Sequence, residues 1–243
     1  MDTKVKGIVL KAIDFKDNDK LLTILTLEKG KIIVKARGVK KASSKLKAYC
    51  QSFCFADFEL IGGVGKINTN YVLSGVNEID NFFDLLMDIE KFNFAFAVLE
   101  IADKICFENQ IYVNIFVDIL KCLKQMAYGN SNAKICLIKF ILNVLNFEGV
   151  NLNLNKCNSC SSPLMSNIYL DLKTGEVLCP VCKTFECIEI EKSVFSSLKI
   201  ISNCSYEKLN TIKLSQNILD KTLSTIVKNL NYKFDFKLKS IEL

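Results

Sequence analysis

The sequence contains no histidine among its 243 residues. This absence excludes catalytic triads built on histidine, histidine proton shuttles and the usual catalytic zinc sites that include histidine. The sequence also has no serine nucleophile elbow of the hydrolase type, and nothing in it indicates the carboxylate pair of a glycosidase. We therefore expect a protein that is not an enzyme.

Long apolar runs are also missing. No uncharged stretch approaches the roughly 18–20 residues of a membrane helix, and the opening Met1-Asp2-Thr3-Lys4 is too polar for a signal peptide. The cysteines are odd in number, eleven, and all but one tetrad lie singly, which favours a reducing compartment over a disulfide framework. We expect a cytoplasmic protein without a membrane partner. With only two prolines, junctions between domains should be tight.

Charge is distributed unevenly along the chain, whose formal net charge is +6. Residues 1–80 hold 14 basic and 9 acidic side chains, and residues 191–243 hold 9 and 5. The middle segment, residues 81–190, holds 9 basic and 12 acidic side chains. Basic ends around a mildly acidic middle predict an anionic partner that touches the ends.

Eight basic residues lie between Lys29 and Lys47, and no carboxylate follows Lys29 until Asp57. The only arginine of the chain, Arg37, lies near the middle of this window. Such a window can bind a phosphate backbone because each neutralised phosphate releases counterions. The alternative is a solvated charged face. We predict DNA contacts with little sequence preference from Lys35, Arg37, Lys40, Lys41, Lys45 and Lys47.

The first eighty residues have the pattern of a small β-barrel. Short apolar and alternating segments are separated by polar turns and by glycines. Five strands in about seventy residues, with glycines at the corners, are typical of an OB-fold. The predicted strands are residues 4–13, 21–27, 31–38, 53–61 and 66–74.

From Asn81 onward the apolar period becomes helical. Gly129–Asn132 has the composition of a loop between helices that supplies an N-cap for the next one. The fold class predicted is α+β, with an OB-fold DNA-binding domain at 1–80 and a helical domain at 81–243. The predicted helices are residues 82–107, 111–127, 133–147, 192–203 and 215–230.

Two Cys-x-x-Cys turns lie eighteen residues apart within segment 157–182, joined by a predicted hairpin at 168–178. Each turn can present two thiolates to one ion, so that two turns complete a tetrahedral zinc shell. Reduced thiols and iron–sulfur ligation are the alternatives. Four thiolates leave no open position for water, so the zinc is predicted to be structural. The predicted ligands are Cys157, Cys160, Cys179 and Cys182.

Other motifs in the sequence give weaker evidence of function. Gly62–Ile67 resembles a phosphate-binding loop only superficially, because a Walker A motif needs glycine where Leu60 stands and Ser or Thr where Ile67 stands. A turn between strands explains the clustered Asp14, Asp17 and Asp19 better than a metal site does. Six aromatic residues near the basic window could stack on bases, but for most of them the strand spacing suits core packing equally well, and for any individual one we favour the core: Phe15, Tyr49, Phe53, Phe55, Phe58 and Tyr71.

The order of several short motifs resembles a known family. Gly7-Ile-Val-Leu, Asn18-Asp-Lys-Leu-Leu, Gly30-Lys and Ala36-Arg-Gly-Val-Lys-Lys follow one another as in the N-terminal signature of the recombination-repair mediator RecO. The resemblance continues through Phe140–Gly149, the four cysteines and the closing Leu238-Lys-Ser. Lysines replace most of the arginines expected in this family, so bidentate phosphate contacts become point-charge contacts.

The resemblance implies an OB-fold, a helical domain with a zinc knuckle, binding of single- and double-stranded DNA, and annealing of complementary strands. It also implies single-stranded-DNA-binding protein, RecR and, indirectly, RecA as partners, and association with the nucleoid. From the residues alone, an adaptor that captures an acidic peptide near Lys121, Lys124 or Lys139 is the alternative. A zinc-ribbon transcription or RNA-binding factor is a third class, but no recognition helix or RNA motif supports it.

Overall fold

The computed structural model describes residues 2–62, 71–164 and 167–241. The chain divides into two compact units, the first comprising Met1–Leu86 with Leu99–Val117 and the second Met87–Val98 with Asp118–Leu243. These units interleave along the sequence, whereas the predicted domains follow one another. The predicted boundary between residues 80 and 81 stays a prediction.

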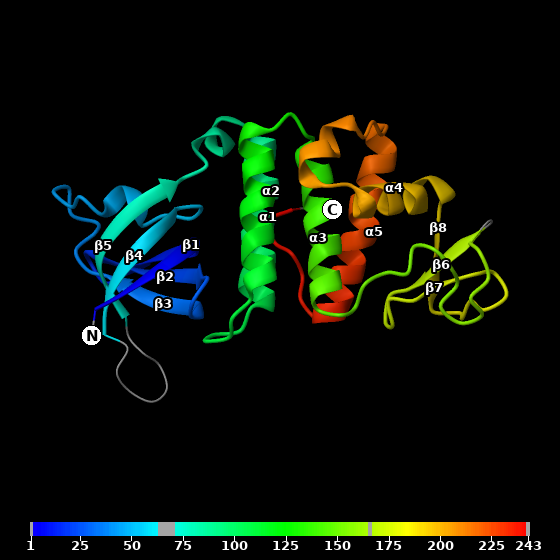
Figure 1. The fold of residues 1–243 in the computed structure, drawn as a ribbon, viewed down its shortest axis with the longest axis horizontal. Helices are drawn as coiled ribbons and strands as arrows, with labels where there is room; N and C mark the ends of the chain where they lie inside the picture. The colour runs from blue at the N-terminus through cyan, green and yellow to red at the C-terminus, as the bar shows by residue number, and fades with distance from the viewer. Residues whose placement is uncertain (1, 63–70, 165–166, 242–243) are drawn as a thin grey trace. The chain divides into compact units, whose positions relative to one another are not determined.

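The first unit contains a closed five-stranded barrel, drawn in blue to cyan in Figure 1. Neighbouring strands are ordered β1-β2-β3-β5-β4, and only the β3–β5 pair is parallel. The predicted OB-type barrel and the α+β class are confirmed. The strands are β1 (Asp2–Phe15), β2 (Asp19–Thr26), β3 (Gly30–Ala36), β4 (Phe55–Ile61) and β5 (Tyr71–Asp80).

The alternation of apolar residues that predicted these strands fills the barrel interior. Val9, Ile24 and Phe58 are fully buried there, because successive residues of a strand point to opposite faces. The last predicted strand, residues 66–74, agrees with the structure only in part. Residues 66–70 and most of the Gly62–Ile67 motif lie outside the described residues, and β5 continues to Asp80, beyond the predicted end.

Gly30, at the β2–β3 turn, shows why this corner requires glycine. Its φ of +69° lies in the left-handed region, and a Cβ atom built there would lie 1.9 Å from the backbone oxygen of Gln110. The backbone N–H of Asn109 donates to the carbonyl of Lys31 at 3.0 Å. The segment around Gln110 is therefore packed against the barrel turn within the first unit.

Two long helices follow the barrel along the chain, α1 (Ile89–Ile105) and α2 (Val113–Tyr128). The prediction that helix begins at residue 82 is wrong, since Phe83–Met87 forms a 3-10 turn. The Asp88 side chain accepts hydrogen bonds from the backbone N–H groups of Glu90 and Lys91. Asp88 thus supplies the N-cap that starts α1. The sequence analysis missed this cap because the apolar period continues through residues 82–88.

The second unit is a helical layer built around α3 (Ala133–Phe147), which is buried along most of its length. The Asn132 side chain accepts from the N–H of Lys134, as the predicted cap requires. Two further helices, α4 (Lys192–Asn203) and α5 (Gln216–Phe234), pack against α3 (Figure 1). The 3-10 segment η3 (Tyr206–Thr211) also contacts α3 and was not predicted.

A small antiparallel sheet precedes α4, with strand order β7-β6-β8. Strands β6 (Ile168–Asp171) and β7 (Val177–Leu178) form the predicted hairpin, and β8 (Cys187–Ile190) adds a third strand that the sequence analysis missed. β8 is only four residues long, too short for its alternation to stand out. Among the helices of the described residues, none is both long enough and apolar enough to span a bilayer.

Candidate nucleic-acid interface and metal centre

The predicted DNA-binding lysines lie at the end of β3 and on the turn-rich segment, residues 37–54, that connects β3 to β4. Val39 and Cys50 are buried in the barrel core, and Leu46 and Tyr49 pack against it. Successive turns are closed by backbone bonds, among them Ser44 N–H to Lys41 O at 3.0 Å. We call residues 37–49 the basic loop. Its apolar residues anchor it, so its charged residues are held on a fixed surface.

Asp19 organises the start of the basic loop. One of its carboxylate oxygens accepts from the N–H of Gly38 at 2.9 Å, and the other lies 3.3 Å from Lys35 Nζ. Gly38 has a φ of +64°, which glycine adopts without strain. The Gly38 hydrogen bond, followed by Lys35, lowers the pKa of Asp19 below its ordinary value. Asp19 thus shapes the loop and neutralises one of the predicted DNA-binding lysines.

Two more cations of the basic window are paired with carboxylates. Lys40 Nζ lies 2.7 Å from Asp14 Oδ2, and the pKa of Asp14 is lowered mainly by this hydrogen bond. Lys31 Nζ lies 3.3 Å from Asp103 Oδ1 and is also bonded to the Asp103 backbone oxygen. The three aspartates come from outside the acid-free window, so the sequence analysis did not anticipate these pairs.

Four cations of the basic loop remain exposed. Within the described part of the chain, their side chains make no ion pair or hydrogen bond. Unpaired ammonium and guanidinium groups on one anchored loop form a positively charged surface that can bind phosphates. These four residues are Arg37, Lys41, Lys45 and Lys47.

The aromatic residues near this loop divide into two groups. Phe53, Phe58 and Tyr71 are buried, as the core-packing interpretation predicted. Phe15 is half-buried, and the ammonium groups of Lys16 and Lys35 lie 5.6 and 5.1 Å from its ring centroid. The ring of Phe15 is therefore already engaged by cations.

The second predicted site lies in the other unit. The Sγ atoms of Cys157, Cys160, Cys179 and Cys182 all lie within 4.8 Å of one another. Cys160 Sγ and Cys179 Sγ are 3.7 Å apart, close to the roughly 3.8 Å that separates two sulfur ligands at about 2.3 Å from a tetrahedral zinc ion. The four thiols therefore fit one tetrahedral ion.

The surroundings of the cysteines also suit a metal. The backbone N–H of Cys179 points to Cys157 Sγ at 3.4 Å, and Ser162 Oγ lies 3.3 Å from Cys160 Sγ. Hydrogen bonding with Ser162 lowers the pKa of the Cys160 thiol to about 6, whereas hydrogen bonding with Cys160 and the other two cysteines raises the pKa of Cys182 to about 11. A thiol that ionises readily is a better metal ligand, because thiolates bind metals and neutral thiols do not. The β6–β7 hairpin holds the two turns together, since Asn158 N–H donates to Val177 O at 2.9 Å.

A buried polar cluster in the second unit was missed by the sequence analysis. The carboxylate of Asp118, only 5% exposed, accepts from Asn143 Nδ2 at 2.8 Å and from the Tyr206 hydroxyl at 2.9 Å. Burial raises the pKa of Asp118 to about 6. Lys139, a candidate for peptide capture, is also buried and donates to the backbone oxygen of Ser202 at 2.7 Å. No sequence signal distinguishes Asp118 from an exposed helical aspartate.

Together these features define a class of protein: an OB-type barrel with an exposed basic loop, combined with a helical unit that carries a four-cysteine site. The sequence matches the family described as recombination protein O N terminal over residues 1–73, and its C-terminal counterpart over residues 86–242. The chain belongs to the RecO family, and the predicted resemblance is confirmed.

Curated relatives agree with this assignment. The chain is 28% identical over 240 residues to a DNA repair protein RecO of Clostridium perfringens, with 98% of this chain and 95% of the relative covered. It is 29% identical over 237 residues to a DNA repair protein RecO of Caldicellulosiruptor saccharolyticus, with 97% and 95% covered. These relatives support a role in DNA repair.

Proposed function

We propose that this protein is a non-enzymatic recombination mediator that binds single- and double-stranded DNA through the basic loop. The observation that carries the proposal is the set of four exposed, unpaired cations on a loop anchored to the barrel core. Lys35 and Lys40 lie in the same region but are paired with Asp19 and Asp14. They contribute to DNA binding only after those pairs open.

Annealing follows from the same electrostatics. Two complementary strands repel each other, and a cationic surface that neutralises their phosphates lowers that repulsion. Holding both strands on one protein also raises their effective concentration. Neither effect requires a covalent step, so no catalytic residue is invoked.

The partners proposed follow from the family. Single-stranded-DNA-binding protein and RecR are the direct partners, and loading of RecA onto coated single strands is the outcome. These events place the protein in the cytoplasm, at the nucleoid. The alternative, an adaptor for an acidic peptide, is weakened because one of its three candidate lysines, Lys139, is buried.

We further propose that Cys157, Cys160, Cys179 and Cys182 hold one structural Zn²⁺. The spacing of the four Sγ atoms supports this ligand set. When bound, the ion cross-links the two Cys-x-x-Cys turns and has no open coordination position for a reaction. The cysteines fix the sheet that precedes α4; they do not contact DNA in this proposal.

The basic loop can be tested with the triple variant R37Q/K41Q/K45Q. Fluorescence anisotropy of a labelled single-stranded oligonucleotide, measured between 50 and 200 mM salt, gives the salt dependence of binding. Each lost phosphate contact should reduce the slope of log affinity against log salt by about 0.7. The triple variant should therefore lose about 2 from the slope, and its annealing rate should fall accordingly.

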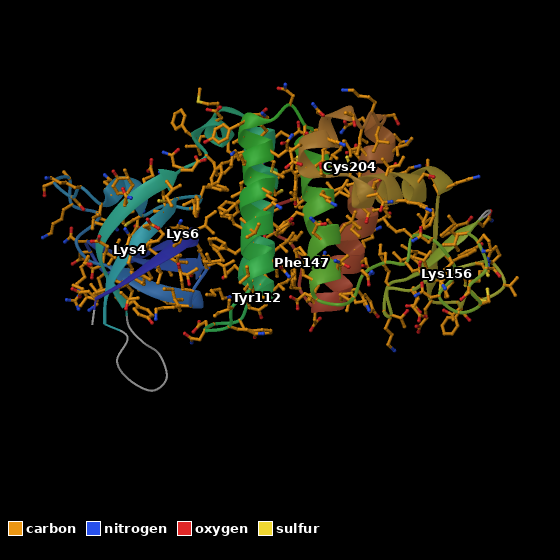
Figure 2. All side chains as sticks on the ribbon, in the orientation of Figure 1. Lys4, Lys6, Tyr112, Phe147, Lys156 and Cys204 are labelled. Carbon is orange, nitrogen blue, oxygen red and sulfur yellow. The ribbon has the colours of Figure 1, made fainter. Side chains whose placement is uncertain are left out.

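The matched control is K104Q/K156Q/K173Q, which removes three exposed lysines far from the basic loop in sequence. Lys156 lies on the cysteine-containing segment in Figure 2. Both triple variants have the same net charge, so a general effect of charge would change them equally. Equal slopes for the basic-loop variant and the parent protein would refute the proposed interface.

A further inference from the structure

The second unit carries another basic surface, a groove of about 860 Å³ along α4 and η3. Three lysines line it, Lys192, Lys199 and Lys208, and no carboxylate does. We call this surface the α4 groove. Its other polar lining residues are neutral: Ser196, Asn203, Cys204, Ser205 and Thr211.

The helical period explains how these residues come together. Lys192, Ser196, Lys199 and Asn203 are separated by four, three and four positions, which places them on one face of α4. Lys192 and Lys199 are about 10 Å apart along the helix axis, at 1.5 Å per residue. Residues on the opposite face, such as Leu198, are buried in the unit. The exposed face is thus a row of hydrogen-bond donors, long enough to meet more than one phosphate.

The charge of the α4 groove is not compensated. Among the residues that the structure describes, no carboxylate pairs with Lys192, Lys199 or Lys208. A larger cavity of the same unit, about 1050 Å³, differs in this respect. Its Lys134 lies 2.7 Å from Asp220 Oδ1, and its Lys221 lies 2.5 Å from Glu191 Oε1. Two lysines of the larger cavity, Lys134 and Lys221, thus have carboxylate partners within the protein, whereas the three lysines of the α4 groove are available to an external anion.

The polar residues of the lining favour a nucleic-acid strand over a peptide. An acidic peptide would need a pocket for an apolar anchor side chain. The aromatic residue of the groove, Phe195, is only 6% exposed, so its ring fills the core. Three other apolar residues line the groove: Ile200 is 52% exposed, and Leu164 and Ile212 are half-buried. Ammonium groups interspersed with hydroxyl and amide donors are the usual contacts to phosphate oxygens.

We infer that the α4 groove is a second nucleic-acid contact, which binds the phosphodiester backbone of a single DNA strand. The inference rests on the proposed function and extends it. With the basic loop in one unit and the α4 groove in the other, one polypeptide has two separate cationic surfaces. Each surface can hold one of the two strands that annealing brings together.

The test is the triple variant K192Q/K199Q/K208Q, measured with a labelled thymidine oligonucleotide between 50 and 200 mM salt. Loss of three single-strand phosphate contacts should reduce the log–log salt slope by about 2, and annealing of complementary oligonucleotides should slow. The control K104Q/K156Q/K173Q should keep the parent slope. Since the three groove lysines are exposed, Tm should not change. If the Tm of the triple variant falls, the single variants K192Q, K199Q and K208Q are measured instead, and each should lose about 0.7 from the slope.

The outcomes separate this inference from the proposed function. An unchanged slope for the groove variant overturns the inference, while a reduced slope for R37Q/K41Q/K45Q still supports the basic loop. A reduced slope for the groove variant with an unchanged slope for R37Q/K41Q/K45Q would refute the basic loop as a DNA contact and support the α4 groove. If the groove variant keeps its DNA slope but no longer binds a labelled oligo-aspartate peptide, the groove is a peptide site and the inference is wrong.

Discussion

Lys40 Nζ lies 2.7 Å from Asp14 Oδ2, so a cation from the middle of the most basic stretch of the sequence is paired with a carboxylate near the end of β1. Asp19, five residues after Asp14, holds Lys35 and the backbone of Gly38 in the same way. These two aspartates reduce the number of cations available to DNA. Removal of the Asp14 carboxylate, which unlike that of Asp19 holds no backbone group of the basic loop, should therefore strengthen DNA binding.

The variant D14N tests this relationship. Release of Lys40 adds one phosphate contact, which should steepen the log–log salt slope for duplex DNA by about 0.9. Affinity at 50 mM salt should rise several-fold, as measured by anisotropy with a labelled duplex.

D17N is the matched control, because Asp17 is an exposed carboxylate in the turn that follows β1 and has no ion pair within the described ranges. It removes the same charge without releasing a lysine, so its slope should equal that of the parent. A D14N slope no steeper than that of D17N would show that the Lys40–Asp14 pair does not limit binding.

DNA binding by the basic loop alone should show a moderate salt dependence. Four contacts, from Arg37, Lys41, Lys45 and Lys47, predict a duplex affinity loss of roughly 10²-fold between 50 and 200 mM salt. Six contacts would predict at least about 10³-fold over the same range. A titration of the variant K192Q/K199Q/K208Q, in which the α4 groove cannot contribute contacts, distinguishes these numbers. A loss close to the larger value would mean that Lys35 and Lys40 leave their aspartates when DNA binds.

Asp118 should make stability depend on pH. Its pKa is raised by burial to about 6 in the folded protein, against 3.8 when exposed. The folded state therefore binds the proton more tightly than the unfolded state, so this group's contribution to stability falls as pH rises through 4 to 6. From pH 7 to pH 5, the parent should gain about 1 kcal/mol in free energy of unfolding relative to D118N.

Urea unfolding of both proteins at pH 5 and pH 7 measures this difference. The comparison with D118N removes other pH effects that the two proteins share, including loss of metal from the cysteines. Asn143, Tyr206, Lys139 and Lys121 act on Asp118 in both measurements. A parent–variant difference that stays constant with pH would show that Asp118 is not protonated in this range.

The four-cysteine site should bind one zinc ion per chain, and C160S should lose it. Three thiolates and a serine hydroxyl cannot complete the same shell. Metal content by atomic spectroscopy should fall from about one ion per chain to well below that, with a lower Tm. DNA binding by the basic loop should be retained.

C187S is the control for this substitution. Cys187 packs against the same small cluster but is not among the four sulfur atoms brought together. Its removal should leave one zinc ion bound. Equal metal loss in C187S and C160S would contradict the proposed ligand set.

Gly30→Ala should destabilise the first unit more than its backbone conformation alone requires. The new Cβ would lie 1.9 Å from Gln110 O at a φ of +69°. Gly149 has a similar φ of +72° but no atom within 4 Å of its virtual Cβ. Gly149→Ala therefore measures the conformational cost, about 1 kcal/mol. Overlap with Gln110 should add about 1–3 kcal/mol in Gly30→Ala. Similar unfolding curves for the two variants would mean that the Gln110 segment moves away.

Much of the architecture could be predicted from local sequence patterns. Alternation of apolar residues identified the first strands, and Asn132 marked the start of α3, because both signals act over a few residues. The start of α1 was placed too early because apolar residues continue through 82–88, whereas the cap at Asp88 determines the boundary. β8 was missed because four residues give too weak a period. The spacing of the two Cys-x-x-Cys turns predicted that the four thiols lie close together, because a short hairpin between the turns brings them to one place.

By itself, the sequence determined that the chain has a strongly basic segment, a cysteine tetrad and no histidine chemistry, because these properties depend only on which residues are present and how they are spaced. Tertiary structure decided which positive charges are free. Folding brings Asp14, Asp19 and Asp103 next to Lys40, Lys35 and Lys31, and leaves Arg37 and Lys41 exposed. Coulomb interactions depend on distance in space and on burial, and neither can be read from positions along the chain.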